Sequence, residues 1–175
     1  PEAMGGDGLT NTKDSRPVAT LSIHSDIDTT DFGISDLRNG QVGHSWVSLI
    51  WDNQNTIFSS IATKYPKHYK YLSKGSSPFG FWPRMFESYN EATDTWINLP
   101  PDQRTGYSTN PFSSYIKGQV VHPDTIHTPK ATQEYKITEK EAINVMNYAE
   151  SKKNADYSVY YFNCTTFAAD AVKSA

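Results

Sequence analysis

Alternating apolar and polar residues predict several β-strands along the chain. In the segment 17–24 (PVATLSIH) the apolar residues from Ala19 to Ile23 stand at every second position, the period of a strand with one buried face. The segment 44–51 (HSWVSLIW) is apolar on both faces, which is typical of a central strand covered on both sides. Further strands are predicted at 56–63, 78–83, 118–122 and 133–137. Because the turn residues DNQN separate 44–51 from 56–63, we expect these two strands to form a hairpin.

Two amphipathic helices are predicted in the last forty or so residues. Thr138 and Glu141 fit a capping box, in which each side chain satisfies an otherwise unpaired N–H at the helix start. The helix near 139–153 then has one apolar face, formed by Ala142, Val145, Met146 and Ala149. A second helix is predicted to begin after Asn163 as N-cap and to bury Phe167, Ala168, Ala171 and Val172. Between them, 157–162 (YSVYYF) is predicted as a short strand or an extended approach.

The remaining segments set the expected domain organisation. Residues 1–16 are rich in Gly, Asp and Thr and have little to bury, so we interpret them as a flexible linker or edge. Residues 17–175 have the length of one domain, and the start at Pro1 favours a domain cut from a longer polypeptide. The stretch 25–41 is polar and rich in turn residues, and it is predicted to be a loop. The stretch around 84–135 shows no sustained period outside its two predicted strands, so we expect an irregular, aromatic-rich insertion there.

The amino-acid composition argues against several classes of function and of site. Aromatic residues make up 13%, with 11 Tyr, 8 Phe and 4 Trp, which favours a β-rich domain and allows a surface for peptide or sugar contacts. The net charge is −3 and no run of Lys or Arg with interleaved aromatics occurs, so nucleic acid is not an expected partner. No apolar run has the length of a membrane span, and no signal peptide is visible. One cysteine excludes an internal disulfide and a zinc site built from several thiolates.

Cys164 stands at a position that favours reactivity. With Asn163 as N-cap, Cys164 is the first residue of a helix, where free N–H groups and the helix dipole favour an anion. A thiolate there has a lowered pKa, and the same N–H groups are placed to hold an oxyanion. The alternative interpretation is that Cys164 is a small apolar residue packed under the preceding strand.

A reactive thiol needs a base, and His44 is the best histidine candidate. It follows Gly43, which permits close backbone approach, and it opens the most apolar strand of the chain. The alternative is a hydrogen-bonded core histidine. The other histidines lie where a base is less expected. His24 ends a strand, His68 lies in a basic loop, and His122 and His127 belong to the stretch HPDTIH.

Taken together, GHSWVSLI (43–50) and NCTTFAADAV (163–172) resemble the circularly permuted branch of the papain-like fold. That branch includes the NlpC-type permuted hydrolases and the lecithin:retinol acyltransferase-like enzymes. In it the histidine strand precedes the cysteine helix, which is the order found here. The stretch GFWP (80–83) is similar to a companion of such histidine strands in bacterial toxin-type members. The resemblance covers about 40–63 and 155–175 and implies an α+β fold, with an antiparallel sheet and the catalytic-cysteine helix packed against it.

The resemblance also implies roles for single residues. Cys164 would be the nucleophile, His44 the general base, and a third polar residue would orient the imidazole from the next strand. In the expected hairpin Thr63 lies opposite His44 and is the candidate, although the family more often has His, Asn, Gln or an acid there. The alternatives are Ser59 or Ser60 in another register, a backbone carbonyl or a residue of the insertion. Asp52 and Asn53 fall at the turn, at the far end of the hairpin.

The function implied is a cysteine-dependent hydrolase, a peptidase or amidase, acting as a secreted or injected bacterial toxin or effector domain within a larger polypeptide. Its substrate would be a protein or a peptidoglycan peptide, selected by the stretch 84–135, and an immunity or inhibitor protein would be its partner. No cofactor and no metal are expected. The alternatives are an acyltransferase or deamidase, a catalytically inactive papain-like binding module, and a metal site. The spacing does not predict the metal site, whose ligands would come from His24, His44, His122, His127 and Cys164.

Overall fold

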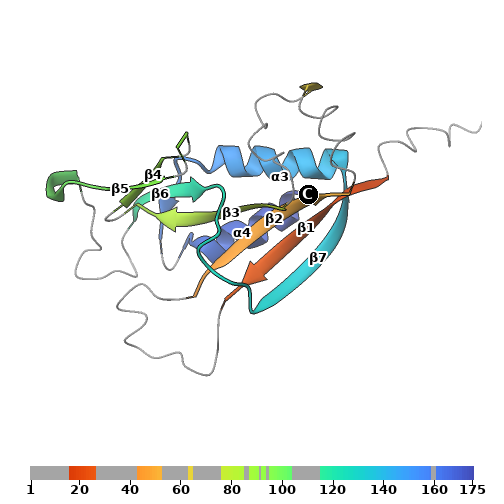
Figure 1. Ribbon diagram of the computed structural model, residues 1–175, viewed down its shortest axis with the longest axis horizontal. Helices are drawn as coiled ribbons and strands as arrows, with labels where there is room; N and C mark the ends of the chain where they lie inside the picture. Colours follow the sequence, from red (N-terminus) through yellow and green to blue (C-terminus); the bar gives the residue numbers. More distant parts are fainter. Residues whose placement is uncertain are drawn as a thin grey trace, which may run out of the picture.

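Six antiparallel strands form one sheet in the order β7-β1-β2-β3-β6-β8 (Figure 1). The computed structural model describes residues 16–26, 43–52, 63–64, 76–84, 87–90, 92–93, 95–103, 115–158 and 161–175. The strands of this sheet are β1 (Pro17–Ser25), β2 (Ser45–Trp51), β3 (Ser76–Pro83), β6 (Ile116–Val121), β7 (Ala131–Thr138) and β8 (Asp156–Tyr157). The α-helices of the described chain are α3 (Glu139–Ser151) and α4 (Cys164–Ser174). The predicted α+β class is therefore confirmed.

Strand β2 is central in the sheet, as predicted, but it is not covered along both faces, because Ile50 is 37% exposed. It pairs with β1 on one edge, where Leu49 lies opposite Leu21, and with β3 on the other, where Val47 lies opposite Phe79. Because both edges of β2 are occupied, the predicted hairpin between 44–51 and 56–63 is wrong. Of the segment 56–63 only Thr63 lies within the described residues.

Local capping signals fix where both helices begin. The Thr138 hydroxyl accepts a hydrogen bond from the Glu141 backbone N–H at 3.2 Å, and the Glu141 carboxylate accepts one from the Thr138 N–H at 3.3 Å. Asn163 caps α4, because its side-chain oxygen accepts from the Thr166 N–H at 3.0 Å. Both predicted caps are confirmed, and the second places Cys164 at the first helical position.

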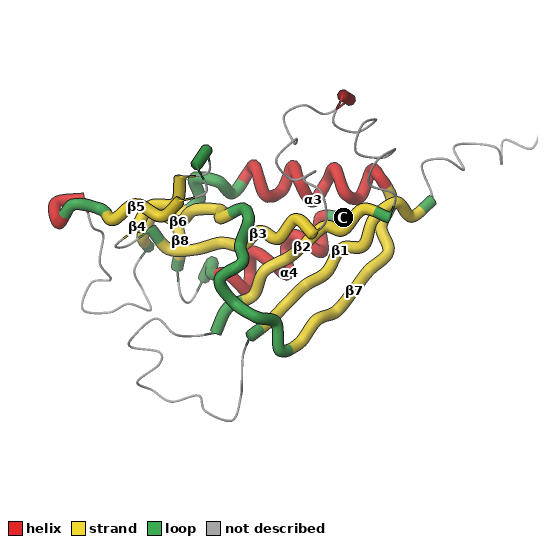
Figure 2. Tube along the Cα trace, in the orientation of Figure 1, coloured by secondary structure: helices red, strands yellow, loops and turns green. Residues whose placement is uncertain are grey.

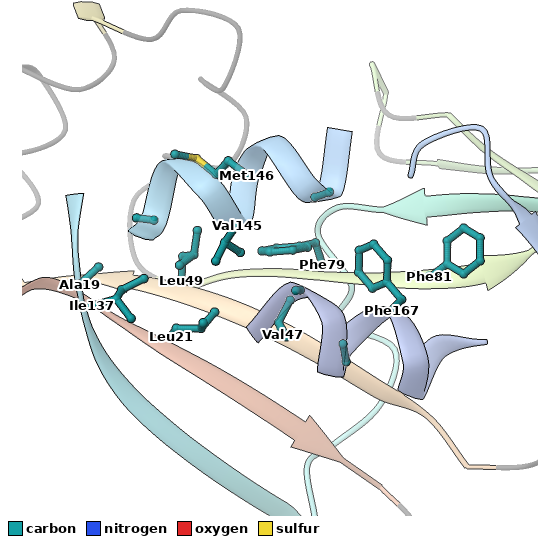
Figure 3. Close-up of a cluster of buried hydrophobic side chains, with 14 of the residues drawn as sticks. Ala19, Leu21, Val47, Leu49, Phe79, Phe81, Ile137, Val145, Met146 and Phe167 are labelled. Atoms are coloured by element: carbon teal, nitrogen blue, oxygen red, sulfur yellow. The ribbon is translucent and has the colours of Figure 1, made fainter. Parts of the chain in front are cut away.

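Both helices pack on one face of the sheet, which is visible in Figure 2. The register brings alternate residues of neighbouring strands onto that face. Figure 3 shows Val145 of α3 and Phe167 of α4 directed into the same apolar cluster. The Phe167 ring stacks on Phe81 with a centroid distance of 5.6 Å. Fully burying such a side chain is worth roughly 1.5–3 kcal/mol, so these contacts fix α4, and with it Cys164, against the sheet.

The stretch 84–135 is more regular than its sequence predicts. It contains a second, two-stranded sheet of β4 (Glu87–Asn90) and β5 (Thr95–Asn98), followed by a short 3₁₀ turn, η3 (Pro101–Gln103). The strands have four residues each and are mostly polar, so no period is detectable. Their aromatic pair Tyr89 and Trp96 stands directly opposite across the hairpin. At the C-terminal side, the predicted extended stretch 157–162 is represented by the last residue of β8 and a bridge between Ser158 and Phe162.

No helix in the described ranges has the length and apolarity needed to cross a membrane.

Candidate active site

The fold brings His44 and Cys164 together. Helix α4 packs on β2 and β3, so its first residue lies beside the residue that precedes β2. The Cys164 thiol donates to the carbonyl oxygen of Gly43 at 3.8 Å, and it lies close enough to the His44 ring for each group to shift the pKa of the other. Both residues are buried, with 5% of His44 and 7% of Cys164 exposed. The predicted pairing of these two side chains is therefore present in the structure.

A carboxylate holds the other side of the imidazole. Asp124 Oδ2 lies 2.6 Å from His44 Nε2, and Asp124 is only 2% exposed. With Nε2 taken by Asp124, Nδ1 is the ring nitrogen left for the Cys164 thiol. Cys164 therefore lies beside an imidazole that is hydrogen-bonded to a carboxylate.

Asp124 is itself fixed from three directions. Trp82 Nε1 donates to Asp124 Oδ2 at 2.9 Å, and the Asp124 backbone N–H donates to the carbonyl of Pro78 at 2.9 Å. Gly80 leaves the space that the carboxylate fills, because a Cβ there would lie 2.1 Å from Asp124 Oδ2 and 3.0 Å from His44 Nε2. The other oxygen, Oδ1, is buried without a hydrogen-bond partner among the described residues.

These contacts shift the ionisation of both reactive groups. Burial lowers the pKa of His44, but the hydrogen bonds and negative charges of Asp124 and Cys164 outweigh it and raise the pKa to about 9. Burial raises the pKa of the Cys164 thiol, but the hydrogen bond and charge of His44 outweigh it and lower that pKa. The backbone N–H of Ser45 and the hydroxyl of Thr165 lower it further. The arrangement therefore favours a thiolate–imidazolium pair.

The start of α4 supports negative charge at the same point. The Asn163 side chain caps the helix, and the Ser45 and Thr165 hydroxyls lie 3.2 Å apart beside the thiol. Free N–H groups and the helix dipole favour an anion in this first turn. An oxyanion formed on a carbonyl attached to Sγ would meet the same N–H groups.

A second histidine–aspartate pair lies against His44. His127 Nδ1 lies 2.5 Å from Asp26 Oδ2, while Asp26 Oδ1 accepts from the His44 backbone N–H. The Asp26 N–H in turn donates to the His44 carbonyl at 3.1 Å. The His127 ring lies 5.2 Å from the His44 ring and stacks on Trp82 at 5.6 Å. Asp26 therefore holds the backbone of His44, and the aromatic rings restrict its side chain.

The structure does not place Thr63 on the imidazole. Thr63 is exposed, in a short helical turn with Lys64, whose ammonium pairs with Glu139 at 3.1 Å at the start of α3. The reason for this correction is the strand pairing: the expected register required 56–63 to lie beside β2, where β3 lies instead. The alternative candidates Ser59 and Ser60 lie outside the described residues, as does Asn53, which was not a candidate. Asp52 pairs with Lys136 at 3.1 Å.

Asp124 comes from the stretch 84–135, which was one of the alternatives left open by the sequence. The local signal for it is weak, because HPDTIH is a polar turn after β6 with a poor metal pattern. Its position next to His44 results from the pairing of β3 with both β2 and β6, where Gly80 pairs with Trp46 and Val121. That pairing joins segments far apart in sequence.

The remaining histidines have structural settings. His24 bonds Thr132 and Ser48 through its two ring nitrogens, each at 2.8 Å. Burial lowers the pKa of His24 and outweighs the charge of Glu134, which raises it. His24 is therefore neutral at neutral pH. His122 is 7% exposed, and His68 lies outside the described residues. Within the described ranges, no three His, Cys, Asp or Glu side chains are arranged to hold a metal ion.

Comparisons of the chain with protein-family models, with curated proteins and with solved structures found no match.

Proposed function

We propose that this chain is a cysteine-dependent hydrolase of amide bonds, a peptidase or amidase, with Cys164 as nucleophile, His44 as acid–base and Asp124 as the orienting carboxylate. One observation carries this proposal: a buried imidazole lies 2.6 Å from a buried carboxylate and beside the only thiol of the chain, whose pKa it lowers. A cysteine that merely packs has no need of an imidazole whose pKa is raised to about 9.

The proposed reaction uses these three side chains in turn. The Cys164 thiolate attacks the amide carbonyl carbon, and the electron pair of the C=O bond moves to oxygen, where N–H groups of the α4 start stabilise it. His44 then gives its proton to the leaving amine as the C–N bond breaks, which leaves a thioester on Cys164. Water attacks this thioester while His44 takes its proton, and the acid product leaves as the thiolate reforms.

Asp124 acts through His44. Its carboxylate holds Nε2, so Nδ1 is directed at the thiol, and its charge stabilises the imidazolium. The tight support of Asp124 by Trp82 and Gly80 keeps that direction fixed. The orienting role that the resemblance assigns to a third residue is therefore proposed for Asp124.

The biological setting in this proposal rests on the resemblance of GHSWVSLI and NCTTFAADAV. It comprises a bacterial toxin or effector domain that is secreted or delivered into a target cell within a larger polypeptide. Its substrate is a protein or peptidoglycan peptide, and an immunity protein is its partner. Transfer of the acyl group to an acceptor other than water would instead give an acyltransferase.

The test is the pH dependence of Cys164 alkylation by iodoacetamide in the wild type and in His44→Ala, with Cys164→Ser as the blank. At pH about 6.5 an ordinary thiol is only ~1% ionised, so we expect the wild type to react roughly 10- to 100-fold faster than His44→Ala. Equal profiles that titrate near 8.5 would contradict the proposal and identify a binding module. A reactive thiol is then incubated with peptide and peptidoglycan-fragment pools, and mass spectrometry identifies the acyl-enzyme and the cleaved products.

A further inference from the structure

Strand β7 lies at one edge of the six-stranded sheet (Figure 1). It pairs with β1 on its inner side, and the described part of the chain places no strand on its outer side. Residues 131–136 are all exposed, although their side chains alternate between the two faces of the sheet. The opposite edge is formed by β8, which has only two residues. The described sheet therefore has one long edge, eight residues in length, that a further strand can join.

The hydrogen bonds between β1 and β2 determine which backbone groups of β7 point outward. At one end of this pair the Asp52 N–H donates to the Val18 carbonyl at 2.9 Å, and at the other end the Asp26 N–H donates to the His44 carbonyl at 3.1 Å. The even-numbered residues of β1 therefore bond to β2, and the odd-numbered ones direct their N–H and C=O groups to β7. Odd residues of β1 pair with odd residues of β7. The even residues of β7 consequently present their N–H and C=O groups to the outer edge.

Two of these outward-facing residues carry opposite charges. Glu134 and Lys136 are two positions apart, so their side chains lie on the same face of β7, and Tyr135 lies on the other face. The Lys136 ammonium lies 3.1 Å from Asp52, and 63% of the Lys136 side chain is exposed, which leaves access for a second carboxylate. Charges on an edge strand normally oppose association because they repel their own copies. With one charge of each sign, an antiparallel copy of the strand can instead bring opposite charges together.

Only one register of two antiparallel β7 strands places Glu134 of each copy opposite Lys136 of the other. Its two-fold axis passes through Tyr135. In this register each Glu134–Lys136 pair also exchanges backbone hydrogen bonds, because both residues direct these groups outward. Tyr135 then faces its own copy in a pair without hydrogen bonds, where side chains approach most closely. A shift by two residues places like charges opposite each other, and a shift by one residue removes the backbone hydrogen bonds.

We propose that β7 pairs with β7 of a second copy of this chain, antiparallel about a two-fold axis at Tyr135, so that two sheets join into one. The charge pattern carries the choice of occupant, because Glu134 and Lys136 of each copy neutralise Lys136 and Glu134 of the other. Strand β1 lies between β7 and β2, the strand that follows His44, so the pairing leaves the candidate active site uncovered. The proposal is independent of the hydrolase activity, and each can fail without the other.

The first test measures the mass of the full chain by analytical ultracentrifugation over a series of protein concentrations. We expect the wild type to dimerise, and Glu134→Lys and Lys136→Glu each to weaken the dimer by roughly 10-fold or more, because like charges then face each other in both pairs. An equimolar mixture of the two variants should dimerise again, since each pair in the mixed dimer has one acidic and one basic side chain. The control is Asp102→Lys, which makes the same change of charge as Glu134→Lys at an exposed residue of η3 and should leave the dimer unchanged.

A second test, which needs no variant, follows hydrogen exchange at the backbone amides of β7. We expect the amides of Glu134 and Lys136 to exchange more slowly as the wild-type concentration rises, while those of Gln133 and Tyr135, which face β1, keep their rates. Slow exchange of the outward amides at the lowest concentration would overturn the proposal, because another segment would then cover the edge.

Three results of the ultracentrifugation would also overturn the proposal. The first is a wild type that stays monomeric up to about 1 mM, where even weak association produces dimer. The second is a loss of dimer in Asp102→Lys equal to that in Glu134→Lys, because net charge alone would then control association. The third is a mixture of Glu134→Lys and Lys136→Glu that stays monomeric although circular dichroism shows both variants to be folded.

Discussion

At the scale of single residues, the ionisation of Cys164 depends on a carboxylate that the thiol does not touch. Asp124 raises the pKa of His44, and the charged His44 in turn lowers the pKa of Cys164. Asp124 therefore lowers the pKa of the thiol indirectly, by keeping the His44 imidazole charged. Removing the Asp124 charge should alter the titration of the thiol without removing any group from it.

We predict that Asp124→Asn lowers the pKa of His44 and raises that of Cys164. The expected result is a loss of roughly 10-fold in the iodoacetamide rate near neutral pH, with the rate at high pH retained. The same substitution at the exposed Asp52 is the control, because it removes an equal charge from a carboxylate that pairs with Lys136. If the two variants gave the same alkylation profile, Asp124 would have no role in activating the thiol.

Gly80 offers a steric test of the same contact. A Cβ at Gly80 would lie 2.1 Å from Asp124 Oδ2, so Gly80→Ala should push the carboxylate off His44. Gly118→Ala is the matched control, because its Cβ would meet the Phe81 ring at 2.1 Å and the Ala155 carbonyl at 2.6 Å.

We expect both glycine variants to lose about 1–3 kcal/mol of unfolding free energy, measured by denaturant titration, because both overpack a filled space. Only Gly80→Ala should lose the neutral-pH reactivity of Cys164. A reactive thiol in Gly80→Ala would show that the site tolerates movement of Asp124.

At the scale of elements, the start of α4 does two things at once. The Asn163 cap fixes the first turn, and that turn presents Cys164 to His44. Helix α3 has an equally well-formed cap at Thr138, and its first residue is Glu139 rather than a cysteine. Comparing cap substitutions in the two helices therefore distinguishes the loss of helix stability from a change in the pKa of the thiol.

We predict that Asn163→Ala and Thr138→Ala each cost roughly 0.5–2 kcal/mol of unfolding free energy. Asn163→Ala should in addition raise the pKa of Cys164, because the first turn that stabilises the thiolate frays. Thermal unfolding measures the first effect, and the pH profile of alkylation measures the second. An unchanged thiol profile in Asn163→Ala would assign the lowered pKa to His44 and its neighbours alone.

The helices and strands that depend on local contacts could be predicted from the sequence. The caps at Thr138 and Asn163 use partners three residues away, so the helix starts could be predicted. Strand existence also followed from local alternation, and the structure places β1, β2, β3, β6 and β7 within two residues of the predicted bounds. Strand pairing did not follow, because the partner of β2 is chosen by the whole sheet. For that reason the sequence pointed to Thr63 as the neighbour of the His44 ring, where the structure has Asp124.

At the scale of the whole molecule, His44 and Cys164 make the free energy of unfolding depend on pH in opposite directions. His44 has a folded pKa of about 9, above its ordinary 6.5. Its contribution to the free energy of unfolding is therefore complete below pH 6.5 and is lost as pH rises through about 9. Cys164 has a lowered folded pKa, so its contribution is complete above about 8.5 and is lost as pH falls through the folded value. At pH values where both groups titrate differently in the folded and unfolded chains, the two slopes oppose each other.

We predict that the unfolding free energy of the wild type changes less between pH about 6.5 and 8.5 than that of Cys164→Ala, because the lowered pKa of the thiol opposes the raised pKa of His44. Cys164→Ala removes one of the two terms, so its stability should fall steadily as pH rises from about 6.5, by at most ~1.4 kcal/mol per pH unit. Denaturant titrations at a series of pH values measure this. Parallel curves for the two proteins would show that the thiol and the imidazole are not coupled.

The spread of the site along the chain has a practical consequence. His44 and Asp124 are 80 residues apart, and Cys164 is the only cysteine of the chain. An unfolded molecule therefore keeps its sulfur but loses the imidazolium that ionises it. Near neutral pH, a haloacetamide label should enter native molecules faster than denatured ones, the reverse of what cysteine labelling normally reports. The label incorporated in a short pulse would then count assembled sites directly, one per folded chain.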